Sequence, residues 1–145
     1  MQAVAVDASV ITKWFVDEPY SEQARKLRDD YVDLKFRLVV PRLARYEVLN
    51  ALKYSGAFGS KELIDIAKIL EDYQLVEIPP DGRYAEETIK ISIEHGVTIY
   101  DASYLAVGKV RGISIFTADE KLLERIKEDA FVKHIRDYQT SASMS

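Results

Sequence analysis

The 145-residue sequence contains no cysteine and only two histidines. The lack of cysteine excludes a disulfide framework and a thiolate zinc site, and zinc usually takes clustered cysteine or histidine ligands. No apolar run approaches the ~20 residues that a membrane-spanning helix needs. The N-terminus has neither the basic flank nor the cleavage site of a signal peptide. We therefore expect a cytoplasmic protein that does not associate with membranes.

The sequence also lacks an excess of positive charge, because its formal net charge is −4 at pH 7. Domains that bind nucleic acid by bulk electrostatics are usually basic, so we expect any contact with nucleic acid to be local. A composition of 48% hydrophobic and 30% charged residues is typical of a globular protein. We expect one domain over residues 1–138 and a disordered tail over residues 139–145.

Short apolar runs alternate along the chain with segments of helical periodicity. The runs predict strands at 3–6, 37–40, 75–78, 113–116 and about 131–135. The periodic segments predict helices at 8–16, 21–33, 42–56, 61–74, 83–95, 98–110 and 117–129. Strands separated by helices form βαβ units. The predicted fold is therefore a three-layer α/β/α domain with a mostly parallel central sheet.

Four carboxylates fall where such a fold would bring them together. In open parallel sheets, sites form beyond the carboxyl ends of the strands. Asp7 ends the first predicted strand, and Asp119 lies three residues after the fourth. Asp101 lies one turn into the helix opened by Thr98, and Glu47 lies about two turns into the helix after the second strand. We expect all four side chains at the same edge of the sheet.

Helix capping offers another explanation for the three aspartates. Asp7 is suited to cap the helix that follows it. Thr117 with Glu120 forms a T-x-x-E capping box, and Thr98 with Asp101 forms a weaker T-x-x-D version. Glu47 is different, because a glutamate in the middle of a helix on an apolar stripe has no capping role. Its burial without a partner would be costly, so it needs a basic neighbour or a metal ion.

Four neighbouring carboxylates repel one another, since two unit charges ~4 Å apart interact by about 4 kcal/mol at an effective dielectric constant of 20. A hard divalent cation offsets this repulsion. Mg²⁺ or Mn²⁺ prefers oxygen ligands, whereas Zn²⁺ prefers the cysteines and clustered histidines that the chain lacks. Hydrated Mg²⁺ in an acidic pocket suits phosphodiester hydrolysis, because the metal lowers the pKa of bound water and neutralises charge on the phosphate.

Four stretches, AVDASVITKWF, VVPRLARYEVLNAL, TIYDASYLAV and IFTADEKLL, occur in this order and at these spacings. Together they resemble the PIN-domain nucleases, most closely the VapC toxins of VapBC toxin–antitoxin pairs, from about Ala3 to Leu123. The resemblance implies that the metal-binding and catalytic acids are the four already identified: Asp7, Glu47, Asp101 and Asp119. The hydroxyls of Ser9 and Thr117 match supporting positions, although both residues would also serve as helix caps.

The resemblance further implies an endoribonuclease that depends on Mg²⁺ or Mn²⁺, cuts RNA and forms a homodimer. A cognate antitoxin would inhibit it by inserting basic or bulky side chains into the site. A non-toxin PIN nuclease of RNA processing and a catalytically silent PIN binding module remain alternatives. A receiver domain is disfavoured because no adjacent acidic pair follows the first strand, and no lysine ends a late strand. A haloacid-dehalogenase-like phosphatase needs D-x-D there, where Ser9 takes the third position.

Other residues are weaker candidates. His95 precedes Gly96 at a helix end, and we expect His134 at the surface. Trp14 and Phe15 are suited to stack on a base, but an aromatic pair in a short helix more often belongs to the core or a dimer surface. Five basic residues near the acidic segments could attract RNA phosphates or simply face solvent: Lys13, Arg42, Arg45, Lys109 and Arg111.

Overall fold

A computed structural model describes residues 2–127 and 129–139 of the chain. Five strands form a single sheet in the order β3-β2-β1-β4-β5, and every neighbouring pair is parallel. The strands are β1 (Ala3–Val6), β2 (Arg37–Pro41), β3 (Val76–Ile78), β4 (Ile115–Thr117) and β5 (Val132–His134). Each lies at or within two residues of its predicted position. The predicted tail falls mainly on residues 140–145, which lie outside the described residues.

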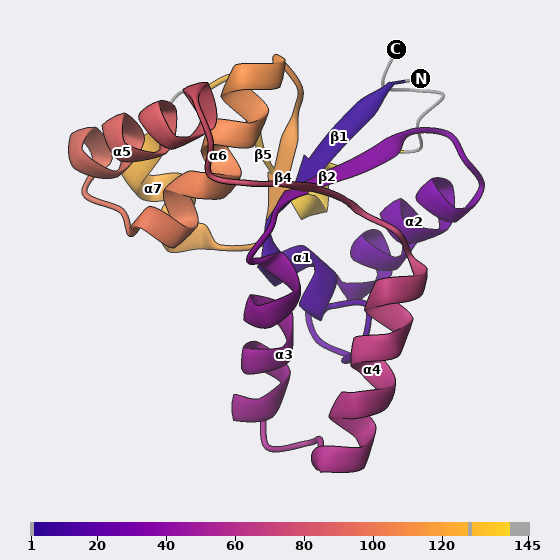
Figure 1. Cartoon of the computed structure of the whole chain (residues 1–145). Coiled ribbons are helices and arrows are strands. Elements are labelled where there is room, and N and C mark those ends of the chain that lie inside the picture. Colours follow the sequence, from indigo (N-terminus) through magenta and orange to yellow (C-terminus); the bar gives the residue numbers. More distant parts are fainter. Residues whose placement is uncertain (1, 128, 140–145) are drawn as a thin grey trace.

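Helices flank the sheet on both sides, which confirms the predicted three-layer arrangement (Figure 1). In Figure 1, α5 and α6 lie on one side of the strands and α2 on the other, while α3 and α4 extend beyond the sheet. The helices are α1 (Ala8–Thr12), α2 (Ser21–Val32), α3 (Ala44–Tyr54), α4 (Ser60–Asp72), α5 (Arg83–His95), α6 (Ile99–Arg111) and α7 (Glu120–Ile126). A 3₁₀ helix, η1 (Ile135–Asp137), follows β5. No helix within the described residues is long and apolar enough to cross a membrane.

The strand order reverses between β1 and β4. From β1 the chain first builds outward through β2 to β3, and then returns to the other side of β1 to form β4 and β5. Ala5 pairs with Val39 of β2 on one side and with Ile115 of β4 on the other. Such a switch point is the expected place for a site in a parallel sheet, and both β1 and β4 are followed within two residues by an aspartate.

The core explains why β1 and β2 consist almost wholly of apolar residues. Val4, Leu38 and Ile115 are at most 1% exposed, because helices cover both faces of the sheet. Gly108 lets α6 lie close to β4, since an added Cβ would come within 3.2 Å of the Ile113 carbonyl oxygen and of Cγ2 of Ile115. This close contact fixes the position of the helix that carries Asp101.

The helix predicted at 8–16 is wrong in its length. It ends at Thr12, and Lys13 occupies its C-cap. Trp14 leaves the helix to enter the core, where it is 4% exposed and its ring meets Tyr73 edge-on at a centroid distance of 5.1 Å. The apolar spacing of this segment therefore reflects burial of a turn, not a longer helix.

The expectation that His134 lies at the surface is also wrong. His134 is 3% exposed, and its Nδ1 accepts a 2.9 Å hydrogen bond from the backbone N–H of Arg136. Burial lowers the pKa of its imidazole. In β5 the exposed Lys133 alternates with the buried His134, so strand periodicity places this histidine inward.

Candidate active site

A cavity of about 450 Å³ opens beyond the carboxyl ends of β1 and β4. All four predicted acids line this cavity, and further residues of α1 and α3 contribute to its wall. Its lining residues are Asp7, Ala8, Ser9, Thr12, Lys13, Glu18, Glu47, Asn50, Ala51, Asp101, Ala118 and Asp119. The sequence prediction that separate elements direct these carboxylates to one edge of the sheet is thus borne out in their placement.

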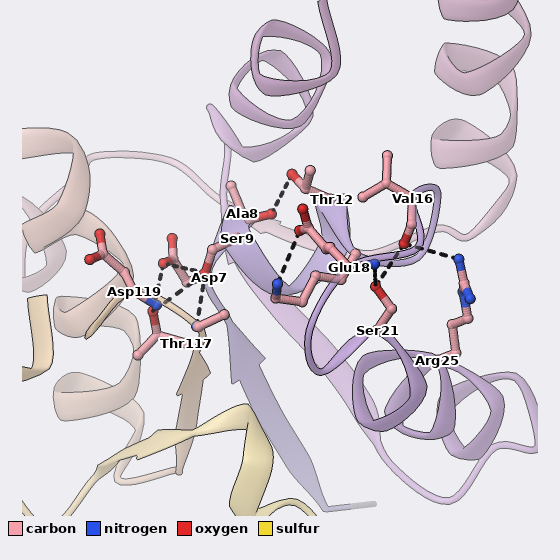
Figure 2. A network of polar contacts seen from close by, with 12 residues as sticks. Asp7, Ala8, Ser9, Thr12, Val16, Glu18, Ser21, Arg25, Thr117 and Asp119 are labelled. Atoms are coloured by element: carbon pink, nitrogen blue, oxygen red, sulfur yellow. Dashed lines mark hydrogen bonds and ion pairs between the residues drawn. The ribbon is translucent and has the colours of Figure 1, made fainter. Parts of the chain in front are cut away.

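Asp7 occupies the N-cap position of α1, but its carboxylate makes no capping hydrogen bond. Its Oδ2 instead accepts hydrogen bonds from Ser9 Oγ at 2.9 Å and from Thr117 Oγ1 at 2.8 Å, as Figure 2 shows. The residue is 6% exposed, and burial raises the pKa of its carboxyl to about 6, while the two hydroxyls act in the opposite direction. Capping therefore does not account for Asp7.

Asp119 has the capping role that the sequence assigned to Thr117. Its Oδ1 accepts a 3.1 Å hydrogen bond from the backbone N–H of Leu122 at the start of α7. The predicted capping box of Thr117 and Glu120 does not form, because Thr117 ends β4 and its hydroxyl donates to Asp7. Thr117 Oγ1 also accepts a hydrogen bond from the Asp119 N–H at 3.0 Å. This hydroxyl joins the two aspartates across the switch point.

Asp101 lies in the first turn of α6, where Thr98 is the N-cap as predicted. The backbone N–H of Asp101 donates to Thr98 Oγ1 at 3.0 Å. Asp101 also lines the cavity. Burial raises the pKa of its carboxyl, the negative charge of Asp119 raises it further, and the Thr98 side chain acts to lower it.

Glu47 lies in the first turn of α3, not two turns into it, because α3 begins at Ala44. Its Oε1 is buried without a hydrogen bond among the described residues, and the same holds for the Tyr104 hydroxyl. Burial raises the pKa of the Glu47 carboxyl, Tyr104 acts against this rise, and the charge of Asp101 adds to it. No ion pair within the described residues joins Glu47 to a basic side chain, so of the two predicted partners a metal ion is the one that stays a prediction.

The carboxylates influence one another through their charges. Besides burial, the pKa of Asp7 is raised by Asp101 and Glu47, and that of Asp101 by Asp119. Across the part of the chain that the structure describes, no three acidic or histidine side chains are arranged as a ready-made metal site. Their donor atoms are nevertheless all oxygen, as Mg²⁺ and Mn²⁺ prefer. A buried oxygen without a hydrogen bond, in a group of mutually repelling carboxylates, is chemically suited to such a cation.

Sequence reasoning missed three polar residues that line the cavity, Thr12, Glu18 and Asn50. Thr12 and Asn50 lie within the stretches AVDASVITKWF and VVPRLARYEVLNAL but carry no charge. Glu18 lies outside the four stretches and reaches the cavity through the turn that follows α1. Of the five basic candidates, only Lys13 lines this cavity. Arg45 pairs with Glu77 at 3.0 Å, and Lys109 with Glu87 at 3.1 Å.

A second cavity, of about 500 Å³, is mainly apolar and lies between α3, α5 and α6. Several large side chains in its lining are strongly exposed. They include Tyr46 at 80%, Tyr100 at 61%, Ile89 at 52% and Ile99 at 49%. Exposed apolar patches of this kind often mark protein contacts.

A family model described as "PIN domain" matches residues 4–129. Two proteins of Pyrobaculum aerophilum are similar in sequence. One, named Ribonuclease VapC3, is 29% identical over 126 residues, which are 84% of this chain and 93% of the relative. The other, named Exonuclease VapC9, is 29% identical over 103 residues, or 68% of this chain and 74% of the relative.

The fold also resembles a chain in the crystal structure of DNA-bound VapBC from Salmonella typhimurium. The match has a TM-score of 0.66, covers 93% of this chain and 99% of the other, and has 15% sequence identity. This likeness supports the fold described above.

Proposed function

The chain belongs to the PIN-domain family, and from this premise we propose that it is an endoribonuclease dependent on Mg²⁺ or Mn²⁺ and the toxin of a type II toxin–antitoxin pair. Two similar proteins are named as a ribonuclease and an exonuclease, both of the VapC type. The observation that carries the metal-dependent activity is the cavity at the β1/β4 switch point, which four carboxylates from separate elements line.

Asp7, Glu47, Asp101 and Asp119 would hold the cation through their carboxylate oxygens. When bound, Mg²⁺ or Mn²⁺ lowers the pKa of a coordinated water and neutralises negative charge on the phosphodiester. Ser9 and Thr117 keep Asp7 in place by hydrogen bonds to its Oδ2. No hydrogen bond to Oδ1 occurs within the described residues, so that oxygen is available to a ligand. Asp119 uses Oδ1 for the α7 cap and would bind through Oδ2.

A cleavage assay with a linear and a circular RNA of the same sequence tests this proposal. We expect cleavage of both RNAs with Mg²⁺ or Mn²⁺ and none with EDTA. Asp7→Asn should lower the rate by orders of magnitude, because a ligand loses its charge, whereas the exposed control Asp33→Asn should not. Cleavage that persists in EDTA through repeated purification would refute the metal mechanism. Cleavage of only the linear RNA would indicate an exonuclease, as the name of one relative suggests.

We propose a small antitoxin protein as the physiological partner, because the similar Salmonella chain comes from a VapBC structure. Expression of the wild-type protein in a bacterial host should arrest growth, and coexpression of the product of a neighbouring gene should relieve the arrest. The Asp7→Asn protein should still bind that product but should not arrest growth. Normal growth with the wild-type protein would favour a role in RNA processing.

A homodimer is part of the same proposal, and the exposed apolar side chains around the second cavity support it. Tyr46 and Tyr100 are 80% and 61% exposed and line this cavity. Trp14, in the turn after α1, is less suited because it lies in the core. Light scattering should give the mass of a dimer for the wild type and of a monomer for Tyr46→Glu. A wild-type mass of about 16.5 kDa at all concentrations would exclude the dimer.

A further inference from the structure

Lys13 is a buried positive charge in the wall of an acidic cavity. Its side chain is 10% exposed, and among the described residues that line the cavity it is the one basic group. Its Nζ lies 3.0 Å from Oε1 of Glu18. No described ion pair joins Lys13 to any of the four candidate metal ligands. Its charge is therefore balanced locally and does not neutralise the acidic cluster.

The turn that connects α1 to α2 is firmly held, so the pair is positioned by a rigid backbone. Ser21 Oγ accepts a 3.1 Å hydrogen bond from the Glu18 N–H and donates one of 2.7 Å to the Val16 carbonyl. Arg25 donates to the carbonyl oxygens of Trp14 and Val16, and Figure 2 shows Arg25 and Ser21 beneath the turn that carries Glu18. The stable position of Lys13 thus does not depend on a substrate.

The two members of the pair differ in their access to water. The Glu18 side chain is 42% exposed, whereas that of Lys13 is 10% exposed. If Glu18 moves away from Lys13, its carboxylate can turn to solvent and be hydrated at little cost. Lys13 is largely shielded from water, so it then needs another anion to balance its charge. Because Lys13 lines the cavity, an anion bound in the cavity can take the place of Glu18.

We propose that Lys13 binds a backbone phosphate of the RNA substrate and that, until the RNA binds, the Lys13 ammonium group pairs with the Glu18 carboxylate. This inference rests on the proposed ribonuclease function. A compact ammonium group suits a phosphodiester as a point charge. Exchange of Glu18 for phosphate keeps the Lys13 charge balanced and releases the Glu18 carboxylate to solvent. It also provides local attraction for RNA in a protein whose net charge is −4.

The test is a set of four variants: Lys13→Met, Glu18→Gln, their double mutant, and Lys26→Met on the exposed face of α2 as the control of equal charge. Binding of a fluorescein-labelled single-stranded RNA is measured by anisotropy with Ca²⁺ in place of Mn²⁺, and cleavage is measured with Mn²⁺. Lys13→Met should raise the Kd and KM by about tenfold. It should also lower the slope of log K against log salt by about 0.7 relative to Lys26→Met.

Glu18→Gln should act in the opposite direction and lower the Kd several-fold, because it frees Lys13. In the Lys13→Met background the same change should have no effect, and this coupling separates competition for Lys13 from a general change in charge. If Glu18→Gln weakens RNA binding and lowers the Tm as Lys13→Met does, the pair is a structural clamp and the proposal is wrong. The proposal also fails if Lys13→Met matches Lys26→Met in Kd and salt slope.

Failure of the proposed function would look different. If the wild-type protein neither binds nor cuts RNA with any divalent cation, the ribonuclease function is wrong, and the role of Lys13 falls with it. If the wild-type protein cuts RNA and the four variants behave alike, only the role of Lys13 is refuted.

Discussion

The hydroxyl of Thr117, at the end of β4, donates a 2.8 Å hydrogen bond to Oδ2 of Asp7, at the end of β1. Thr117 is fully buried, and its Oγ1 also accepts from the backbone N–H of Asp119. One side chain therefore fixes the distance between the two aspartates at the point where the strand order reverses. Asp7 and Asp119 are thus connected through the Thr117 hydroxyl and not through a helix cap.

Removal of this hydroxyl should affect both stability and cleavage. Thr117→Val keeps the shape of the side chain but leaves the Asp7 carboxylate with one hydrogen bond fewer and the Asp119 N–H without its acceptor. We expect a loss of about 1–3 kcal/mol in the free energy of unfolding, measured by urea denaturation in EDTA, and slower RNA cleavage. Thr117→Ser keeps the hydroxyl and is the control. Equal stability of the valine and serine variants would contradict this role.

The raised pKa of Asp7 predicts how stability depends on pH in metal-free protein. Between the ordinary value of 3.8 and about 6, the folded protein holds a proton on Asp7 that the unfolded chain has released. Stability contributed by this group is therefore present below pH 4 and is lost as the pH rises to about 6. The loss is about 3 kcal/mol at 1.36 kcal/mol per pKa unit.

Asp7→Asn should remove this part of the pH dependence. In EDTA the variant should match the wild type near pH 4 and exceed it in Tm by several degrees at pH 7. Asp33→Asn, at an exposed position, should follow the wild-type curve throughout. Melting curves from pH 4 to pH 8 measure this difference. If Asp7→Asn is less stable than the wild type at pH 7, the carboxylate stabilises the fold, and the assignment to a site loses its support.

Much of the fold follows from local sequence signals. The strands were predicted within two residues because short runs such as RLVV are apolar and end at proline or aspartate. The placement of the four acids followed from topology alone, since parallel strands direct their carboxyl ends to one edge. Thr117 was assigned to a cap because T-x-x-E is a local pattern, whereas its actual partner, Asp7, is 110 residues away.

The turn after α1 shows where local reasoning fails. Its apolar residues continue the helical spacing, but Trp14 packs against Tyr73 and Arg25 binds the carbonyls of the turn. These contacts hold the turn that follows the helix end at Thr12 and that carries Glu18 to Lys13. The acids could thus be predicted from sequence, while the basic residue beside them could be suggested but not distinguished from four others.

Two buried tyrosines form a natural comparison for stability. The Tyr138 hydroxyl donates a 2.6 Å hydrogen bond to Oδ2 of Asp30, which is 5% exposed. The Tyr104 hydroxyl is equally shielded but makes no well-formed hydrogen bond among the described residues, although it acts to lower the pKa of the nearby Glu47 carboxyl. Tyr138→Phe should therefore cost about 1–3 kcal/mol, whereas Tyr104→Phe should cost less. Urea denaturation in EDTA measures both, and equal losses would contradict this difference.

Addition of metal should stabilise the folded protein, because a ligand that binds only the native state raises stability by RT ln(1 + [L]/Kd). At a Mn²⁺ concentration one hundred times the Kd, the gain is about 2.7 kcal/mol. Glu47→Gln and Asp101→Asn each remove one negative charge from the proposed ligand set, so their melting temperatures should rise far less with Mn²⁺. Asp33→Asn should respond as the wild type does. Because the pKa of Asp7 is raised to about 6, the Mn²⁺ effect should weaken as the pH falls from 7 to 5. A Mn²⁺-dependent rise in Tm that is the same for the wild type, Glu47→Gln and Asp101→Asn would place the metal elsewhere on the protein.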